Sequence, residues 1–150
     1  MAVYDAASTI RESRARYFER SGFAADGGYS DKWVKLKIGR AFVAFPNTAS
    51  RVRSVRLHDI HHVLTEYDTT WTGEAEIAAW ELASGCARHY PAWVLNLGAM
   101  AIGFAIAPRR TFSAFGRGWR SRNLYRGQFS DTLLDRTVGE LREELGIHSQ

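Results

Sequence analysis

An almost wholly apolar segment, residues 92–107, lies between Pro91 and Pro108 and most restricts how this chain can fold. Proline is tolerated in the first turn of a helix and ends a helix that precedes it, so the segment predicts one helix. Asn96 interrupts the apolar run, which is shorter than the roughly 20 apolar residues of a membrane span. We therefore expect a core helix or a membrane-facing groove. Its small residues would admit another helix or a chain-like ligand: Gly98, Ala99, Gly103 and Ala105.

The length and composition indicate a single globular domain over residues 1–150. A chain of 150 residues with 45% apolar and 24% charged residues can build a packed core, which excludes disordered and collagen-like classes. The one cysteine, Cys86, excludes an internal disulfide, and we expect it to be a buried residue in a reducing compartment. Residues 1–22 lack the apolar region and cleavage site of a secretory signal, so we expect a cytoplasmic protein.

Hydrophobic periodicity predicts helices and one short β-hairpin. Val34, Leu36 and Ile38 alternate with lysines before a Gly-Arg pair and the apolar run 41–45, a pattern typical of a hairpin near residues 33–45. Helical patterns are found over residues 3–18, 48–55, 56–67, 73–84, 92–107 and 131–145. The fold class that follows is mainly α, a single-domain helical bundle with a short β-hairpin.

The histidines within residues 56–67 indicate a metal site. His58 and His62 are four residues apart, so a helix brings both rings to one face, at a spacing that lets two imidazoles bind one metal ion. Asp59 and Glu66 share that polar face, while the opposite side of the helix is apolar. An ordinary solvated helix face produces the same pattern and stays open as the alternative.

The next predicted helix adds two carboxylates, Glu74 and Glu81, which fall among apolar residues. Carboxylates on an apolar side need a cation or hydrogen-bond donors, because unpaired buried charge is costly. An antiparallel pair of these helices would create a mixed nitrogen and oxygen site suited to a divalent transition metal. For Glu74 the alternative is a first-turn acid stabilised by the helix dipole.

The order of these residues resembles a known motif. His58-Asp59-Ile60-His61-His62, followed after eleven residues by Glu74, has the H-D-x-x-H, eleven-residue gap, E pattern of the ubiquinone (coenzyme Q) biosynthesis protein 4 family. Segments 123–125 and 141–147 resemble that family's closing segment, so the resemblance extends over residues 46–147. It implies a largely helical fold, with His58, Asp59, His62 and Glu74 as ligands of a divalent metal cation, zinc first and manganese, iron or cobalt as alternatives.

The resemblance also implies an activity. The family acts in ubiquinone assembly on polyprenylated aromatic rings at a membrane surface, and its proposed reaction is oxidative replacement of the ring carboxylate at C1 by a hydroxyl. In that scheme a metal ion stabilises developing negative charge and a neighbouring carboxylate, Glu81 or Glu66, is the catalytic group that transfers protons. The alternative is a non-catalytic scaffold that binds a prenyl lipid and presents quinone intermediates to other quinone-biosynthesis enzymes. A His-Asp phosphohydrolase needs an upstream histidine, and none precedes His58.

An arginine-rich stretch suggests where the protein acts. Residues 109–126 contain six arginines, interleaved aromatic residues and no acidic residue. Such a stretch suits an anionic membrane surface or a lipid head group, or is a solvated face, and without a nucleic-acid-reading motif we expect no nucleic acid partner. Residues 92–107 could line a tunnel for a prenyl tail or belong to the core. Together the two segments predict a peripheral protein at the inner face of the membrane, and the small-residue helix face favours a homodimer.

Overall fold

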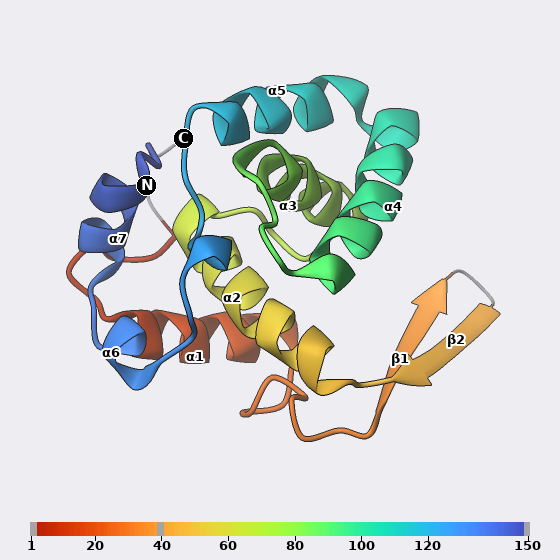
Figure 1. Ribbon diagram of the computed structural model, residues 1–150, viewed down its shortest axis with the longest axis horizontal. Coiled ribbons are helices and arrows are strands. Elements are labelled where there is room, and N and C mark those ends of the chain that lie inside the picture. The colour runs from red at the N-terminus through yellow and green to blue at the C-terminus, as the bar shows by residue number, and fades with distance from the viewer. Residues whose placement is uncertain (1–2, 39–40, 149–150) are drawn as a thin grey trace.

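Helices form most of the chain in the computed structural model, which describes residues 3–38 and 41–148, with the backbone alone for 36–38 and 41–43 (Figure 1). In chain order the elements are α1 (Ile10–Ser21), β1 (Trp33–Ile38), β2 (Ala41–Pro46), α2 (Ala49–Thr65), α3 (Trp71–Ser84), α4 (Tyr90–Ile106), α5 (Pro108–Trp119), a 3-10 turn η1 (Leu124–Arg126), α6 (Asp131–Leu134) and α7 (Val138–Leu145). The predicted fold class, mainly α with a short hairpin, is confirmed.

Helix α2 runs through the middle of the molecule, between α1 and α7 on one side and α3 on the other (Figure 1). Helices α4 and α5 wrap around α3, and both come close to its backbone. At Gly118 a Cβ atom would lie 2.3 Å from the carbonyl oxygen of Trp80, and at Gly103 one would lie 2.5 Å from the Cβ of Ala75. Glycine is therefore required at both positions for α3 to pack this closely.

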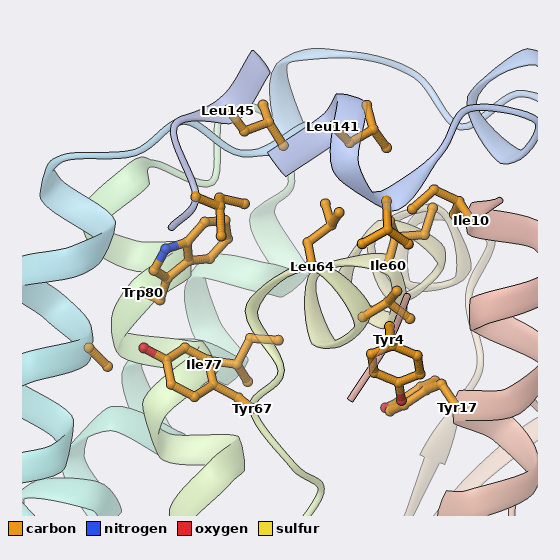
Figure 2. Close-up of a cluster of buried hydrophobic side chains, with 14 of the residues drawn as sticks. Tyr4, Ile10, Tyr17, Ile60, Leu64, Tyr67, Ile77, Trp80, Leu141 and Leu145 are labelled. Atoms are coloured by element: carbon orange, nitrogen blue, oxygen red, sulfur yellow. The ribbon is translucent and has the colours of Figure 1, made fainter. Parts of the chain in front are cut away.

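The main core forms where α1, α2, α3 and α7 meet (Figure 2). Ile60 and Leu64 of α2 lie between Ile77 of α3 and Leu141 of α7, and all four are buried. The residues of α2 that fill this core are the apolar ones that recur at helical spacing in the sequence. The opposite face of α2 is thereby turned towards α1 and the start of α3.

Strands β1 and β2 form an antiparallel hairpin that projects from the helices (Figure 1). The register pairs Trp33 with Pro46 and Ile38 with Ala41, so the predicted hairpin is confirmed. The predicted Gly-Arg turn, residues 39–40, lies outside the described residues.

Several helix boundaries differ from the prediction for local reasons. The helix predicted over 3–18 begins only at Ile10, because Thr9 forms a capping box with Glu12. The helices predicted over 48–55 and 56–67 are one continuous helix that starts after the N-cap Thr48. The helix predicted over 131–145 is broken into α6 and α7, where Thr137 caps the second piece.

Helix α4 is not the core helix that its composition favours. Its only buried residues are Ala92, Asn96 and Gly103, which face the rest of the protein in a narrow strip. The large apolar side chains lie on the outer surface rather than in an enclosed tunnel, with Val94 70% exposed and Leu97 53% exposed. Among the described residues no helix is long and apolar enough to cross a membrane.

Candidate metal centre

His58 and His62 of α2 meet Glu74 of α3 at one point. Their Nε2 atoms lie 3.2 Å apart, and the Glu74 carboxylate oxygens lie 3.6 Å from His58 Nε2 and 3.5 Å from His62 Nε2. One donor atom from each residue falls within 4.8 Å of the others, a separation that one metal ion can bridge. The four-residue spacing on α2 and the position of Glu74 in the first turn of α3 produce this arrangement.

Independent acceptors orient both imidazole rings. His58 donates its Nδ1–H to Glu81 at 2.9 Å, and His62 donates its Nδ1–H to the carbonyl oxygen of Tyr67 at 2.8 Å. In the neutral form of each ring these bonds keep the proton on Nδ1 and leave the lone pair on Nε2, which is the form that binds a metal ion. Tyr17 of α1 also stacks on the His62 ring, with centroids 5.2 Å apart. The two Nε2 atoms thus point at a shared position beside Glu74.

The charges around this point attract a cation. Burial opposes ionisation of Glu74, but hydrogen bonds and charge from His58 and His62 hold its pKa well below the ordinary value. Burial likewise disfavours the charged form of His58, yet Glu81 and Glu74 raise the pKa of that imidazole well above its ordinary value. Two imidazole nitrogens and one carboxylate form the donor set of catalytic zinc sites and of non-haem iron sites. His58, His62 and Glu74 are therefore the residues that could hold a metal ion.

Asp59, the fourth predicted ligand, does not join this group. Its Oδ2 accepts a 2.5 Å hydrogen bond from the hydroxyl of Tyr29, which lies on the loop after α1. Burial raises the pKa of Asp59, while the charge of His58 and the bond from Tyr29 act in the opposite direction. The structure brings together three of the four predicted ligands and gives Asp59 a different partner.

Glu81, predicted as a proton-transferring catalytic residue, lies behind the His58 ring, where it positions that ring. It is fully buried, and its carboxylate accepts four hydrogen bonds: from the Nδ1–H of His58 and His61, the side-chain amide of Asn96 and the hydroxyl of Tyr125. Burial disfavours its charge, but the two histidines hold the pKa of Glu81 well below its ordinary value. A carboxylate with this many donors stays ionised and fixes the His58 ring from behind.

Glu66, the other predicted catalytic residue, connects distant segments instead. It ends α2 with a positive φ of 63° and pairs with Arg142 of α7 at 2.8 Å. The same carboxylate oxygen also accepts the backbone N–H of Val3 at 2.9 Å. Arg142 bonds the carbonyl oxygens of Leu64 and Val63 as well, so the pair holds the end of α2 against α7. In this structure Glu66 thus makes structural contacts and lies in an ion pair with Arg142.

His61 belongs to the site in a way that the sequence pattern did not reveal. It is fully buried, donates Nδ1–H to Glu81 at 2.6 Å and accepts the backbone N–H of Leu124 at 3.0 Å through Nε2. Burial lowers the pKa of this imidazole. Because both ring nitrogens are engaged, His61 connects α2, α3 and η1 rather than binding a metal ion. The three-residue spacing from His58, close to one helical turn, was the available indication in the sequence.

The solvated-face alternative is wrong for these residues. Asp59 is 5% exposed and His62 only 1% exposed, and the polar face of α2 is covered by α1, α3 and the loop around Tyr29.

Cys86 is buried, as expected, and burial raises the pKa of its thiol to about 12, so it is no nucleophile.

Comparisons with protein-family models, with curated proteins and with solved structures found no match for this chain.

Proposed function

We propose that the chain is a metal-dependent enzyme that removes the ring carboxylate of a polyprenylated hydroxybenzoate in ubiquinone assembly. The observation that carries the proposal is the convergence of His58, His62 and Glu74, with both rings held by their Nδ1 atoms in the metal-binding tautomer. The choice of substrate rests on the H-D-x-x-H and Glu motif, since the geometry supports a metal ion without selecting a ring. A metal ion bound there supplies a positive charge for a carboxylate or phenolate oxygen.

The chemistry narrows the choice of metal. Replacing a ring carboxylate by a hydroxyl releases carbon dioxide and needs dioxygen, two electrons from an external reductant and three protons, with water as the second product. Zinc has no redox chemistry, whereas iron and manganese do. The two-histidine, one-carboxylate set is the one that non-haem iron oxygenases use, so we place iron or manganese ahead of zinc for the oxidative reaction.

Asp59 takes the proton-transferring role that Glu81 and Glu66 do not fill. It directly follows His58 on α2, and in the described structure it pairs with the neutral hydroxyl of Tyr29 rather than with a cation. Glu81 is occupied by four donors and Glu66 is tied to Arg142. Asp59 is therefore the site carboxylate that can exchange a proton, and Tyr29 holds its Oδ2 in place.

Helix α4 and the start of α5 support a membrane-bound substrate. The outer surface of α4 is apolar, with Ile106 53% exposed, and in α5, the next helix, Phe112 in the first turns and Trp119 at the far end are exposed as well. Residues 82–130 contain seven arginines and no acidic residue. An exposed apolar helix flanked by aromatic and basic side chains binds at the surface of an anionic bilayer. We propose peripheral attachment through this surface, at the inner face of the membrane.

A turnover assay separates the enzyme from the scaffold alternative. Carbon dioxide release from a prenylated hydroxybenzoate in detergent, with iron(II) or manganese(II), dioxygen and reductant, should require all three candidate ligands, His58, His62 and Glu74. Glu74→Ala should abolish release while the far-ultraviolet circular dichroism spectrum and prenyl-lipid binding stay unchanged. If the wild-type protein binds the prenyl lipid but releases no carbon dioxide, the function is that of the non-catalytic scaffold.

Co-sedimentation with vesicles tests the membrane surface. Wild-type protein should sediment with phosphatidylglycerol vesicles, and Leu97→Asp should lower the bound fraction strongly because it places a charge on the apolar face. Ala15→Asp, on the exposed side of α1, is the matched control and should bind like wild type. Unchanged vesicle binding by Leu97→Asp would refute membrane attachment through this surface. If the wild type instead forms a concentration-dependent dimer that Leu97→Asp disrupts, the surface binds a second copy of the chain.

A further inference from the structure

A cavity of about 490 Å³ lies at the base of the β-hairpin, away from the histidine cluster. Its walls come from the loop after α1, the first residues of β1 and the first turn of α2. Lys32, Lys35 and Arg51 line it, against one acid, Asp31. A concave surface of this size accommodates a small organic ligand, and the excess of positive charge selects an anionic one.

Arg51 is held rigidly at this cavity. Its Nη1 donates to the side-chain oxygen of Asn47 at 2.8 Å, and Asn47 in turn donates to the carbonyl oxygens of Asp31 at 2.8 Å and Gly28 at 3.2 Å. The guanidinium also lies 5.7 Å from the centre of the Phe45 ring. These contacts fix the planar group before any ligand arrives, which lowers the entropic cost of binding.

The charge on Arg51 lacks a counter-ion in the described part of the chain. No carboxylate there lies within ion-pair distance of its guanidinium, and its buried Nε has no hydrogen-bond partner. Burial lowers the pKa of Arg51, and the charge of Asp59, which forms no ion pair with it, offsets this effect only in part. Burying a guanidinium without an ion-pair partner costs free energy. An anion that binds to Arg51 would offset that desolvation cost.

We propose that this cavity binds a phosphate-class anion, the phosphate or diphosphate group of a second ligand. A guanidinium group such as that of Arg51 can donate two parallel hydrogen bonds to a phosphate in a bidentate arrangement. Lys32 and Lys35 supply further positive charge for a dianion. Trp33, 55% exposed at the rim, offers an aromatic face to the organic part of such a ligand.

The cavity lies on the side of α2 that also carries the metal centre. Arg51 and His58 are seven residues apart, which is close to two full turns and a rise of roughly 10 Å. Arg51 of the anion site therefore lies on the same face of α2 as His58, about two turns nearer the N-terminus of the helix. It goes beyond the proposed decarboxylation, whose substrate carries no phosphate.

Calorimetric titration with inorganic pyrophosphate, in buffer with a metal chelator, tests the proposal. Wild-type protein should bind, and Arg51→Gln should bind at least about tenfold more weakly because a charge-assisted pair is lost. Arg53→Gln, two residues along on an exposed part of the same helix, should bind like wild type. Lys32→Gln with Lys35→Gln changes exposed side chains only, so it should fold normally and also weaken binding.

Three results would overturn the proposal: no heat of binding with the wild type, equal weakening by Arg53→Gln and Arg51→Gln, or loss of binding in His62→Ala. The last would place the anion at the histidine cluster instead. Retained binding in His62→Ala would support an independent site even if the decarboxylation assay failed. A second titration with phosphatidylglycerol vesicles assigns the source of the phosphate, since dependence of vesicle binding on Arg51 identifies a lipid head group and independence identifies a soluble ligand.

Discussion

Replacement of Glu81 by glutamine should weaken both the fold and the metal centre. The carboxylate accepts four hydrogen bonds in a fully buried position, two of them from His58 and His61. A glutamine oxygen can still accept two of these bonds, but its NH₂ group meets the remaining donors, Asn96 and Tyr125. Hydrogen bonds to a charged group contribute roughly 1.5–3 kcal/mol, against about 0.5–1.5 kcal/mol for neutral pairs.

The expected loss of stability follows from these two effects. Two bonds weakened by about 1 kcal/mol each, plus one or two lost at about 1 kcal/mol each, amount to about 3–4 kcal/mol. Urea unfolding with a metal chelator present measures this loss without a contribution from metal binding. Metal affinity should fall in addition by about 10–100-fold, since His58 loses the acceptor that orients it.

Glu76→Gln is the matched control on the same helix. The Glu76 side chain is 9% exposed, but its partner Arg110 is 60% exposed and a glutamine keeps one of the two hydrogen bonds, so the loss should cost only about 1 kcal/mol. An unfolding free energy for Glu81→Gln within about 0.5 kcal/mol of the wild type would refute the reasoning, because the buried network would then contribute no more than a surface contact.

Three further predictions concern the fold. Gly118→Ala should destabilise the protein by about 2–3 kcal/mol in thermal unfolding because its Cβ would collide with Trp80, whereas exposed Gly116→Ala, with open space around it, should be neutral or stabilise by up to about 1 kcal/mol. Equal effects would contradict the close packing of α5 on α3. Arg142→Met should cost about 3–5 kcal/mol in urea unfolding, since the carbonyl oxygen of Leu64 loses its side-chain donor and the Glu66 carboxylate loses its counter-ion. The Cys86 thiol should resist a thiol reagent at pH 8 in the native protein and react in urea, because it is buried and its pKa is raised to about 12.

The histidine pair of the candidate metal centre was predictable because the geometry of one helix brings the two rings together, whereas Glu74 joins them through the packing of α3 against α2. His58 and His62 share a face at four-residue spacing, and Glu74 stands in the first turn of the next helix. The contacts of the other carboxylates, Glu66 and Asp59, were not predictable from helical periodicity. Glu66 meets Arg142 from far along the chain and Asp59 meets Tyr29 from a loop, and no local period encodes either contact.

Helix α4 shows the same limit for the fold. Its composition indicates burial, yet its buried residues include the short Ala92 and Gly103, and Gly103 lies against Ala75 of α3. Close packing selects small residues for the buried strip and leaves the large apolar residues outside. The sequence therefore predicts the existence of the helix, while its surroundings depend on tertiary contacts.

The metal content of the purified protein tests the central claim most directly. Elemental mass spectrometry after reconstitution with iron(II), manganese(II), zinc or cobalt(II) should find about one metal ion per chain in the wild type. His62→Ala and Glu74→Ala should lose it while keeping their circular dichroism spectra, and His148→Ala, an exposed histidine outside the cluster, should keep it. A wild-type protein that binds none of these metals, or variants that retain the full content, would contradict a metal centre at His58, His62 and Glu74.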